Sequence, residues 1–348
     1  MPAAPAPTKF SVIIVNYNGG HFIQGALDSL ERQTFRDFEV ILIDNNSSDG
    51  SADDLRTGGL PAFRLIKQDT NLGFAAGNNL AAANATGEWL ALLNPDAAAE
   101  RDWLEQLKSA MDRHPTIRQF ACTQLDLARP EYLDGVGDAY LVFGMPWRGG
   151  FGLSASLLPA EGTCFSPCGA SAVIRRDVFN YHNGFDERFF CYCEDVDLGY
   201  RMQLAGDQCV FVPSAVVHHA GSAVSGRHSD FSIYHGTRNR IWTYAKSTPL
   251  ALLILTLPVH IALSLYVLIR SPAIHRFSTT FKGMRDGLAG VIAIRGPSPW
   301  APSRRKVSLF NLAKQMAWNP FRMSRRLPHV RPLSTITEAP DARSSSGI

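Results

Sequence analysis

The sequence predicts an α/β fold, because short apolar runs of strand length alternate with helical patterns along the N-terminal third of the chain. Residues 10–17 and 39–43 are rich in β-branched residues, which is typical of parallel strands covered on both faces. Apolar residues recur at helical spacing over residues 22–30 between them. Residues 64–67 and 88–93 are the third and fourth predicted strands. This alternation predicts a doubly wound open sheet.

Two further helices complete the pattern. Residues 75–85 are rich in alanine and lie between the third and fourth strands. Leu104, Leu107 and Met111 share one face of a helix that follows the fourth strand. With 348 residues in all, the chain can form one large domain of about 250 residues and an appendage.

Polar side chains follow each predicted strand at the point where it ends. Turn formation by Asn and Asp explains any one of them. Four strand ends in succession instead indicate a ligand site, because the carboxyl ends of parallel strands meet at one edge of the sheet. The residues are Asn16, Tyr17 and Asn18 after the first strand, Asp44, Asn45 and Asn46 after the second, Asn71 after the third, and Asp96 after the fourth.

A second acidic signal lies far downstream. Glu194, Asp195 and Asp197 follow an aromatic run over residues 185–193 and precede a probable helix. Buried carboxylates are costly without partners, so such a cluster indicates a functional site. Together with Asp96, which lies in a turn after an apolar run, it predicts one metal site and one general base.

Several familiar motifs are absent or incomplete. Residues 18–20 lack the glycine patterns of dinucleotide and P-loop sites. Residues 169–173 have a valine where a nucleophile elbow needs its second glycine, which favours a small-residue turn beneath a substrate. The six cysteines lack paired C-x-x-C spacing, so we expect reduced thiols. Residues 1–9 contain no signal-peptide core, so we expect the body of the protein in the cytosol.

The net charge of +3 hides an asymmetry along the chain. Residues 270–348 hold 14 Lys and Arg against 3 Asp and Glu, a net +11, which leaves −8 for residues 1–269. A basic tail of this kind is attracted to anionic lipid or to nucleic acid. A solvated, partly disordered terminus is the alternative interpretation.

Seven motifs in order resemble the inverting glycosyltransferases of family 2, and in particular the rhamnosyltransferase-like members that extend bacterial cell-surface glycans. The resemblance covers about residues 9–245. The motifs are SVIIVNYN (11–18), IDNNSSDGS (43–51), NLGFAAGNN (71–79), LLNPDA (92–97), CGASAVIRR (168–176), FDERFFCYCEDVDLGYR (185–201) and HHAGSAVSG (218–226).

The resemblance implies a GT-A fold with a mixed sheet, a nucleoside-diphosphate sugar donor linked to dTDP or UDP, and a divalent cation, Mg²⁺ or Mn²⁺. It places Asp44 against the nucleoside and the loop after the first strand beside it. Arg238 lies on a predicted helix and is a candidate to bind a phosphate group of the donor or of the acceptor. The residues expected to bind the nucleotide sugar are Asn16, Tyr17, Asn18, Asp44, Asn71, Gly73, Asn78, Asn94 and Arg238.

The family's metal-binding Asp-x-Asp motif reads Asn94-Pro95-Asp96 here, so only the second carboxylate is present. Mg²⁺ takes one or two carboxylates and completes its shell with phosphate oxygens and water. The resemblance implies His219 as a further ligand, and a nitrogen donor favours Mn²⁺. His218 is its neighbour and is the alternative ligand.

The family's Glu-Asp motif maps onto Glu194 and Asp195, and we expect Asp195 to be the general base that takes a proton from the acceptor hydroxyl. The N-terminus of a helix would keep its carboxylate ionised. We expect Glu194 and Asp197 to raise the pKa of Asp195 and Arg201 to offset that rise. The alternative is that Asp195 only caps the helix.

Residues 249–269 contain no charged side chain and are long enough to span a bilayer, but Pro258 and His260 interrupt them. One span would put the acidic body and the basic tail on opposite sides of the membrane. Such an orientation is disfavoured, because basic segments next to a span stay on the cytosolic side. We therefore expect a kinked helix or helical hairpin in the membrane interface, with a lipid-linked glycan acceptor. A soluble core helix or a dimer helix is the alternative.

These expectations give a peripheral enzyme on the cytoplasmic face of the bacterial inner membrane, with the membrane surface rather than nucleic acid as its partner. Two rival functions stay open, a nucleotide-sugar hydrolase or nucleotidyltransferase and a non-catalytic sugar-nucleotide-binding scaffold. The predicted domains are a disordered N-terminus (1–8), a GT-A catalytic domain (9–245) with a nucleotide-sugar half (9–97) and an acceptor half (98–245), membrane-associated helices (246–300) and a basic, partly disordered tail (301–348).

Overall fold

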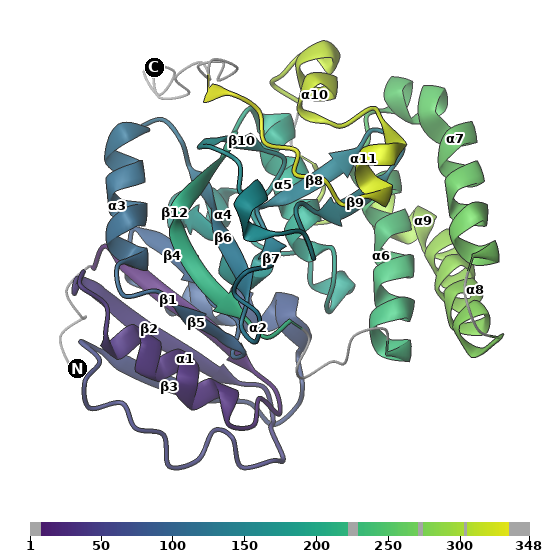
Figure 1. The fold of residues 1–348 in the computed structure, drawn as a ribbon. Coiled ribbons are helices and arrows are strands. Elements are labelled where there is room, and N and C mark those ends of the chain that lie inside the picture. The colour runs from purple at the N-terminus through teal and green to yellow at the C-terminus, as the bar shows by residue number, and fades with distance from the viewer. Residues whose placement is uncertain (1–7, 222–228, 271–273, 303–304, 334–348) are drawn as a thin grey trace, which may run out of the picture.

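A ten-stranded mixed sheet organises the protein (Figure 1). The computed structural model describes residues 8–221, 229–270, 274–302 and 305–333. Within them the strand order is β10-β12-β6-β11-β4-β1-β2-β3, with β5 beside β12 and β7 beside β6. A separate two-stranded sheet pairs β8 with β9.

The N-terminal elements follow the predicted alternation of strands and helices closely. β1, β2 and β3 pair in parallel, and β4 lies parallel to β1 on its other side. The register sets Asn16 opposite Asp44, so the polar ends of the first two strands lie at one edge. The elements are β1 (Phe10–Asn16), α1 (Phe22–Glu31), β2 (Phe38–Asp44), β3 (Phe63–Lys67), α2 (Gly73–Ala83) and β4 (Trp89–Leu92).

The following segment turns this parallel sheet into a mixed one. β11 runs antiparallel between β4 and β6, and β12 returns parallel to β6. The α/β class and the mixed sheet are therefore confirmed. The elements are β5 (Ala97–Ala99), α3 (Trp103–Arg113), β6 (Gln119–Asp126), β7 (Leu133–Gly135), β8 (Asp138–Leu141), β9 (Met145–Arg148), β10 (Gly162–Cys164), β11 (Val173–Arg175), α4 (Arg176–Tyr181), α5 (Glu194–Ala205) and β12 (Cys209–His219).

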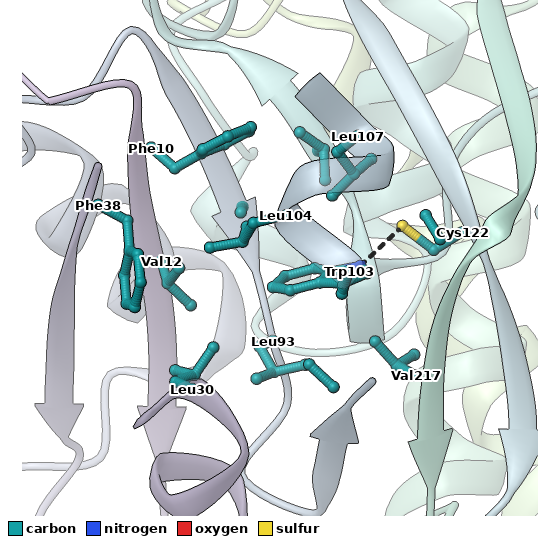
Figure 2. Packing of buried hydrophobic residues seen from close by; sticks show 14 of the residues in the cluster. Phe10, Val12, Leu30, Phe38, Leu93, Trp103, Leu104, Leu107, Cys122 and Val217 are labelled. Carbon is teal, nitrogen blue, oxygen red and sulfur yellow. Dashed lines mark hydrogen bonds between the residues drawn. The ribbon is translucent and has the colours of Figure 1, made fainter. Parts of the chain in front are cut away.

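Two apolar cores cover the two faces of the sheet, because successive side chains of a strand point to opposite faces. Phe10 and Val12 pack with α1 and α3, whereas Ile13 and Val15 pack with α2, α4 and α5. Trp103 is fully buried in the first core, and its Nε1 donates to Cys122 Sγ at 3.3 Å (Figure 2). Every residue of β1, β2 and β4 is buried, as their near-continuous apolar sequences predict.

A group of helices follows the sheet: α6 (Asp230–Ser247), α7 (Leu250–Ile269), α8 (Ile274–Ala289) and α9 (Val291–Arg295). α6 lies between the sheet and α7, and α8 packs along α6 (Figure 1). α6 crosses the predicted domain boundary at 245/246, so one continuous helix joins the helical group to the body that contains the sheet. Within the described residues, α7 alone is long and apolar enough to cross a membrane by length and composition.

The basic C-terminal segment is more ordered than we expected. Its described residues 305–333 pack on the body and include α10 (Leu309–Gln315) and α11 (Pro320–Ser324). Ala317 N donates to Tyr140 O at 2.9 Å, and Arg331 exchanges backbone hydrogen bonds with Thr163. Residues 1–7 of the N-terminus predicted to be disordered, and residues 334–348 of the tail, lie outside the described chain.

Candidate active site

A cleft opens at the edge of the sheet where β1, β2 and β4 end. The loop before α5 and the first turn of α6 supply its other wall. Six of the residues predicted for the site line it, namely Tyr17, Asn71, Gly73, Asn94, Asp96 and His219. The other lining residues are Val15, Asn45, Phe74, Pro95, Arg148, Phe190, Cys191, Tyr192 and Phe231.

Four further predicted residues lie beside the cleft and not in its lining. Asn16 and Asp44 end β1 and β2, and Asn16 Nδ2 donates to Asp44 Oδ1 at 3.3 Å. Asn18 has a positive φ of 52°, and its Oδ1 accepts a backbone hydrogen bond from the loop after β2. Asn78 is buried in α2, and its Nδ2 donates to Phe74 O at 2.8 Å. These contacts brace the loops that form the cleft.

His219 joins the polar groups at one end of the cleft. Its Nε2 lies 3.2 Å from Asp96 Oδ1 and 3.2 Å from Asn94 Nδ2. Its Nδ1 lies 2.7 Å from Asp134 Oδ2. Burial lowers the pKa of His219, but the hydrogen bonds with Asp134 and Asp96 outweigh it, so the pKa is raised.

His218, the alternative ligand, lies on the opposite face of β12, because neighbouring residues of a strand alternate. Its Nε2 is 2.6 Å from Glu100 Oε1. The structure thus separates the two histidines and turns His219 alone toward the cleft.

Arg148 extends the network from His219 toward the helix α5. Its guanidinium lines the cleft and donates to Asp134 Oδ2 at 2.6 Å, the same oxygen that lies next to His219. Asp134 is almost fully buried, with 1% of its surface exposed, so it needs these partners. A chain of contacts therefore runs from Asp96 through His219 and Asp134 to Arg148.

Asp195 lies in the first turn of α5, and its two carboxylate oxygens accept backbone hydrogen bonds. Oδ2 accepts from Gly169 N and Oδ1 from Val196 N, each at 2.8 Å. Burial raises the pKa of Asp195, and these N–H groups and the positive charge of Arg148 offset only part of the rise. A raised pKa makes the carboxylate a stronger base.

Glu194 is buried beside Asp195, and its Oε2 has no hydrogen-bond partner. Burial, followed by the negative charge of Asp195, raises the pKa of Glu194 well above its usual range. Asp195 has donors from two other residues and a nearby arginine, whereas Glu194 has an unpaired oxygen. Asp195 is therefore the better stabilised of the two as an anion.

A buried ion cluster, formed by Asp186, Asp197, Arg201 and Lys246, fixes α5 against α6. Lys246 Nζ lies 2.7 Å from Asp186 Oδ2 and 2.8 Å from Asp197 Oδ2. Arg201 Nε lies 2.9 Å from Asp197 Oδ2. All four side chains are at most 1% exposed. Breaking such a pair by removing one partner typically costs about 3–5 kcal/mol.

This cluster corrects our expectation for the charges around Asp195. Asp197 is neutralised inside the cluster, and Arg201 pairs with it there. The cation that acts on Asp195 is Arg148, which the sequence did not single out.

The loop before α5 has an unusual backbone, with φ of +66°, +72° and +66° at Phe190, Tyr192 and Cys193. Left-handed conformations are unfavourable for residues with side chains and persist only where the surroundings hold them. Asn239 of α6 is fully buried, and its Nδ2 donates to three carbonyl oxygens within residues 189–192 at 2.7 to 2.9 Å. This amide holds the loop that leads into Glu194.

Arg238 does not line the cleft and is used elsewhere. Its guanidinium lies 4.2 Å from the ring of Trp242, and it donates to Phe189 O at 3.0 Å. The contacts of Arg238 support the same loop from α6, so the geometry gives no support to its predicted phosphate contact.

Asp138 and Cys168 bring a carboxylate oxygen and a sulfur close to Asp195, with the three candidate ligand atoms within 4.8 Å of one another. Burial raises the pKa of Asp138 well above its usual range and that of Cys168 to about 12. A metal ion binds the deprotonated forms of these groups, so the raised pKa values disfavour a metal ion there.

Sequence reasoning missed Asp134, Arg148, Asp138 and Asn239. The first three lie on the short strands β7, β9 and β8, where runs of three or four residues are too short to show a periodicity. Asn239 follows Arg238 on α6, where no motif in the sequence marks it. The glycines near Asp134 and Arg148 are the one feature of the sequence that could have pointed to these two residues, and such a pattern is only weakly specific.

Comparisons with known proteins agree with this geometry. Residues 11–181 match the model of glycosyl transferase family 2. N-acetylglucosaminyl-diphospho-decaprenol L-rhamnosyltransferase of Mycobacterium tuberculosis is 30% identical over 239 residues, which cover 62% of this chain and 77% of that protein. The chain belongs to glycosyl transferase family 2. The O-antigen biosynthesis protein RfbC of Myxococcus xanthus is 32% identical over 232 residues, 62% of this chain and 18% of that protein.

Solved structures of glycosyltransferases share the fold of this family 2 chain. S. aureus TarS in complex with UDP-GlcNAc matches with a TM-score of 0.56 and 15% identity, over 91% of this chain and 92% of that one. The mannosyltransferase PcManGT from Pyrobaculum calidifontis, in complex with GDP-Man and Mn²⁺, matches with a TM-score of 0.52 and 21% identity, over 86% and 81%. These likenesses show the GT-A fold.

We predict that Asn239→Leu loosens the loop before α5. The substitution keeps the volume but leaves three carbonyl oxygens without their donor, which should lower the free energy of unfolding by about 1–3 kcal/mol. Urea unfolding measures the loss, and hydrogen exchange should quicken at residues 190–194. Asn180→Leu, at an exposed amide of α4, is the control and should change neither. If hydrogen exchange at residues 190–194 is the same in Asn239→Leu as in the wild type, the loop keeps its conformation without the amide of Asn239.

Proposed function

We propose that this glycosyltransferase transfers a sugar with inversion from a nucleoside-diphosphate donor to a hydroxyl of a lipid-linked glycan, with Asp195 as the general base. One observation carries the proposal. Contacts run from Asp96 through His219 and Asp134 to Arg148, and the positive charge of Arg148 acts on Asp195, which lies behind the wall of the same cleft. These two carboxylates lie a hundred positions apart in the chain, and the sequence predicted both.

The surroundings of Asp195 suit a proton acceptor. Its two oxygens are held by N–H groups of Gly169 and Val196, so the carboxylate keeps a fixed orientation. Phe74 lines the cleft and lies against Gly169, so Asp195 sits directly behind the cleft wall. Inversion follows if the acceptor hydroxyl, deprotonated by Asp195, attacks the anomeric carbon from the face opposite the nucleotide.

We predict that Asp195→Asn lowers kcat by about 10²-fold or more and lowers the free energy of unfolding by only about 1–2 kcal/mol. The amide oxygen keeps one of the two backbone hydrogen bonds, but the amide nitrogen cannot accept the other, and the side chain cannot take the proton. Asp177→Asn is the matched control, because Asp177 lies in the first turn of α4 and also accepts a backbone hydrogen bond there. Turnover is measured as nucleoside diphosphate released in the presence of acceptor. Near-normal turnover of Asp195→Asn would remove this residue from the mechanism.

The residues at the other end of the cleft fit a divalent cation. Asp134 accepts from Nδ1 of His219, which directs Nε2 toward Asp96 as a ligand atom. Asn94 turns its Nδ2 toward Nε2 of His219, so the ligand atoms that the structure gathers here are one carboxylate and one imidazole. When bound, the cation would stabilise the charge of the leaving diphosphate. Because the pKa of His219 is raised, the cation must displace a proton from Nε2, and its affinity should increase with pH.

We predict that Asp134→Asn weakens Mn²⁺ binding about 10- to 100-fold, although Asp134 is not a ligand. The variant loses the partner that orients His219. Thermal-shift titration with Mn²⁺ in the presence of UDP or dTDP measures the affinity, because a ligand of the folded state raises the melting temperature. Asp112→Asn, at an exposed position of α3 where the carboxylate pairs with Lys108, is the control. Equal affinity in Asp134→Asn and the wild type would contradict a cation at His219.

The choice of sugar and acceptor comes from the relatives. The mycobacterial relative is named as an L-rhamnosyltransferase of N-acetylglucosaminyl-diphospho-decaprenol. We extend this to a deoxyhexose such as rhamnose and a polyprenyl-linked glycan here. Transfer from dTDP-rhamnose to such an acceptor tests it. Sugar release without acceptor would instead favour a nucleotide-sugar hydrolase, and binding without turnover would favour a scaffold.

We further propose that α7 lies on the cytoplasmic surface of the membrane. Its inward stripe recurs every fourth residue and contains Thr256, His260 and Ser264, whereas its outward face is apolar. This is the reverse of a helix that packs on a soluble core. Leu255 is 71% exposed and Leu265 is 48% exposed, and such an apolar surface indicates a membrane or partner contact.

We predict that Leu255→Gln/Leu265→Gln lowers partition onto phosphatidylcholine–phosphatidylglycerol vesicles by about tenfold or more, because less apolar area enters the interface. Flotation of the full-length protein measures the bound fraction. Leu157→Gln/Leu158→Gln is the matched control, since these leucines are 56% and 36% exposed on the body. Equal partition of the two variants would assign α7 to another role.

A further inference from the structure

A cavity of about 570 Å³ lies between α6, α7 and α8, and three arginines line it. Arg240 comes from α6, Arg270 from the end of α7 and Arg276 from α8. The other lining side chains include Ser232 and Thr237, and no described lining residue is acidic. We infer that this cavity binds the phosphoryl headgroup of an anionic membrane lipid.

The burial of Arg240 is the first reason. Its Nε is buried without a hydrogen-bond partner, and its NH2 has a long contact of 3.5 Å with Ser264 Oγ. The described residues give it no ion pair with a carboxylate. A guanidinium withdrawn from water without a counter-ion is costly, so an external anion is the natural partner. Burial accordingly lowers the pKa of Arg240, with no carboxylate to restore it.

Arg276 gives a second, independent observation. Its Nε is also buried and unpartnered. Asp286, nearly three turns further along α8, pairs with Arg285 instead. Arg270 adds a third cation at the mouth, beside the ring of Tyr266 at 6.0 Å. Guanidinium groups bind phosphate oxygens through paired N–H donors, so three of them around one cavity fit a phosphate or a diphosphate.

The position of the cavity argues for a lipid as the source of the phosphate. It opens beside α7, whose outward apolar face is proposed to lie on the membrane, and this part of the inference rests on that proposed function. The cavity also flanks the first turn of α6, where Phe231 lines the active-site cleft and the next residue, Ser232, lines the cavity. A headgroup there is held next to the enzyme's acceptor side.

The test compares two variants that remove the same charge. Arg270→Gln/Arg276→Gln alters the cavity, and Lys282→Gln/Arg285→Gln alters exposed positions of α8 outside it. Full-length proteins are floated, without sugar donor, on vesicles of phosphatidylcholine alone, with phosphatidylglycerol, or with a polyprenyl phosphate. Non-specific electrostatic attraction to the vesicle surface should fall equally in both variants, because each loses two positive charges. We expect the cavity variant to lose about tenfold more affinity for an anionic vesicle than the control, the scale of one charged hydrogen bond.

The vesicles also identify the source. A loss confined to polyprenyl phosphate would assign the cavity to the acceptor lipid, and a loss confined to phosphatidylglycerol would assign it to bulk phospholipid. Equal losses in the two variants would overturn the site. Stabilisation by inorganic pyrophosphate alone, with no preference between vesicles, would overturn the assignment to a lipid. Loss of binding to every vesicle, including the neutral one, would point to the apolar face of α7 instead.

Arg240→Met separates binding from packing. Removing an unpaired buried charge should leave the melting temperature unchanged or raise it, while the preference for anionic vesicles falls. A lower melting temperature would overturn the role of Arg240, because it would show that the guanidinium stabilises the helix packing. Transfer to a soluble acceptor should persist in all these variants, so failure of this inference is distinguishable from failure of the proposed reaction.

Discussion

The buried ion cluster of Asp186, Asp197, Arg201 and Lys246 is the constraint on which the active site depends. It joins α5, the loop before it and α6 with charges that have almost no contact with water. None of the four can move without leaving a partner uncompensated, at a cost of several kcal/mol. α5 is thereby fixed, and with it the position of Asp195. The strained loop before α5 is tolerated because Asn239 of the same helix α6 binds its carbonyl oxygens.

A second network links the two ends of the cleft and explains how one fold sets two carboxylates to different tasks. Asp96 faces His219, whose other nitrogen contacts Asp134, and Arg148 shares that oxygen of Asp134. The positive charge of Arg148 then partly offsets the effect of burial on Asp195. The protonation of the base and the geometry of the proposed cation site are coupled through one buried carboxylate.

The helical group beyond the sheet combines two features that are costly in a soluble protein. α7 turns its polar stripe inward and its apolar side chains outward. The cavity beside it buries arginine atoms without partners. Either feature alone has several explanations, but the proposed membrane contact would satisfy both, because acyl chains would cover the apolar face and phosphate groups would neutralise the cations. Residues of α6 line both the cavity and the cleft, so the two proposed sites share one element.

The sequence by itself determined the α/β alternation, the carboxyl-edge position of the polar residues, and the identity of Asp96, His219 and Asp195 as candidates. Those inferences rest on local periodicity and on motif order, and both can be recognised in the sequence itself. Tertiary structure alone decided that β11 runs antiparallel and that His219 rather than His218 faces the cleft. It also decided that Arg148 is the cation near Asp195 and that Arg238 supports a loop while Arg240 faces a cavity. Pairing between side chains distant in the chain depends on packing, and no local pattern records which arginine meets which carboxylate.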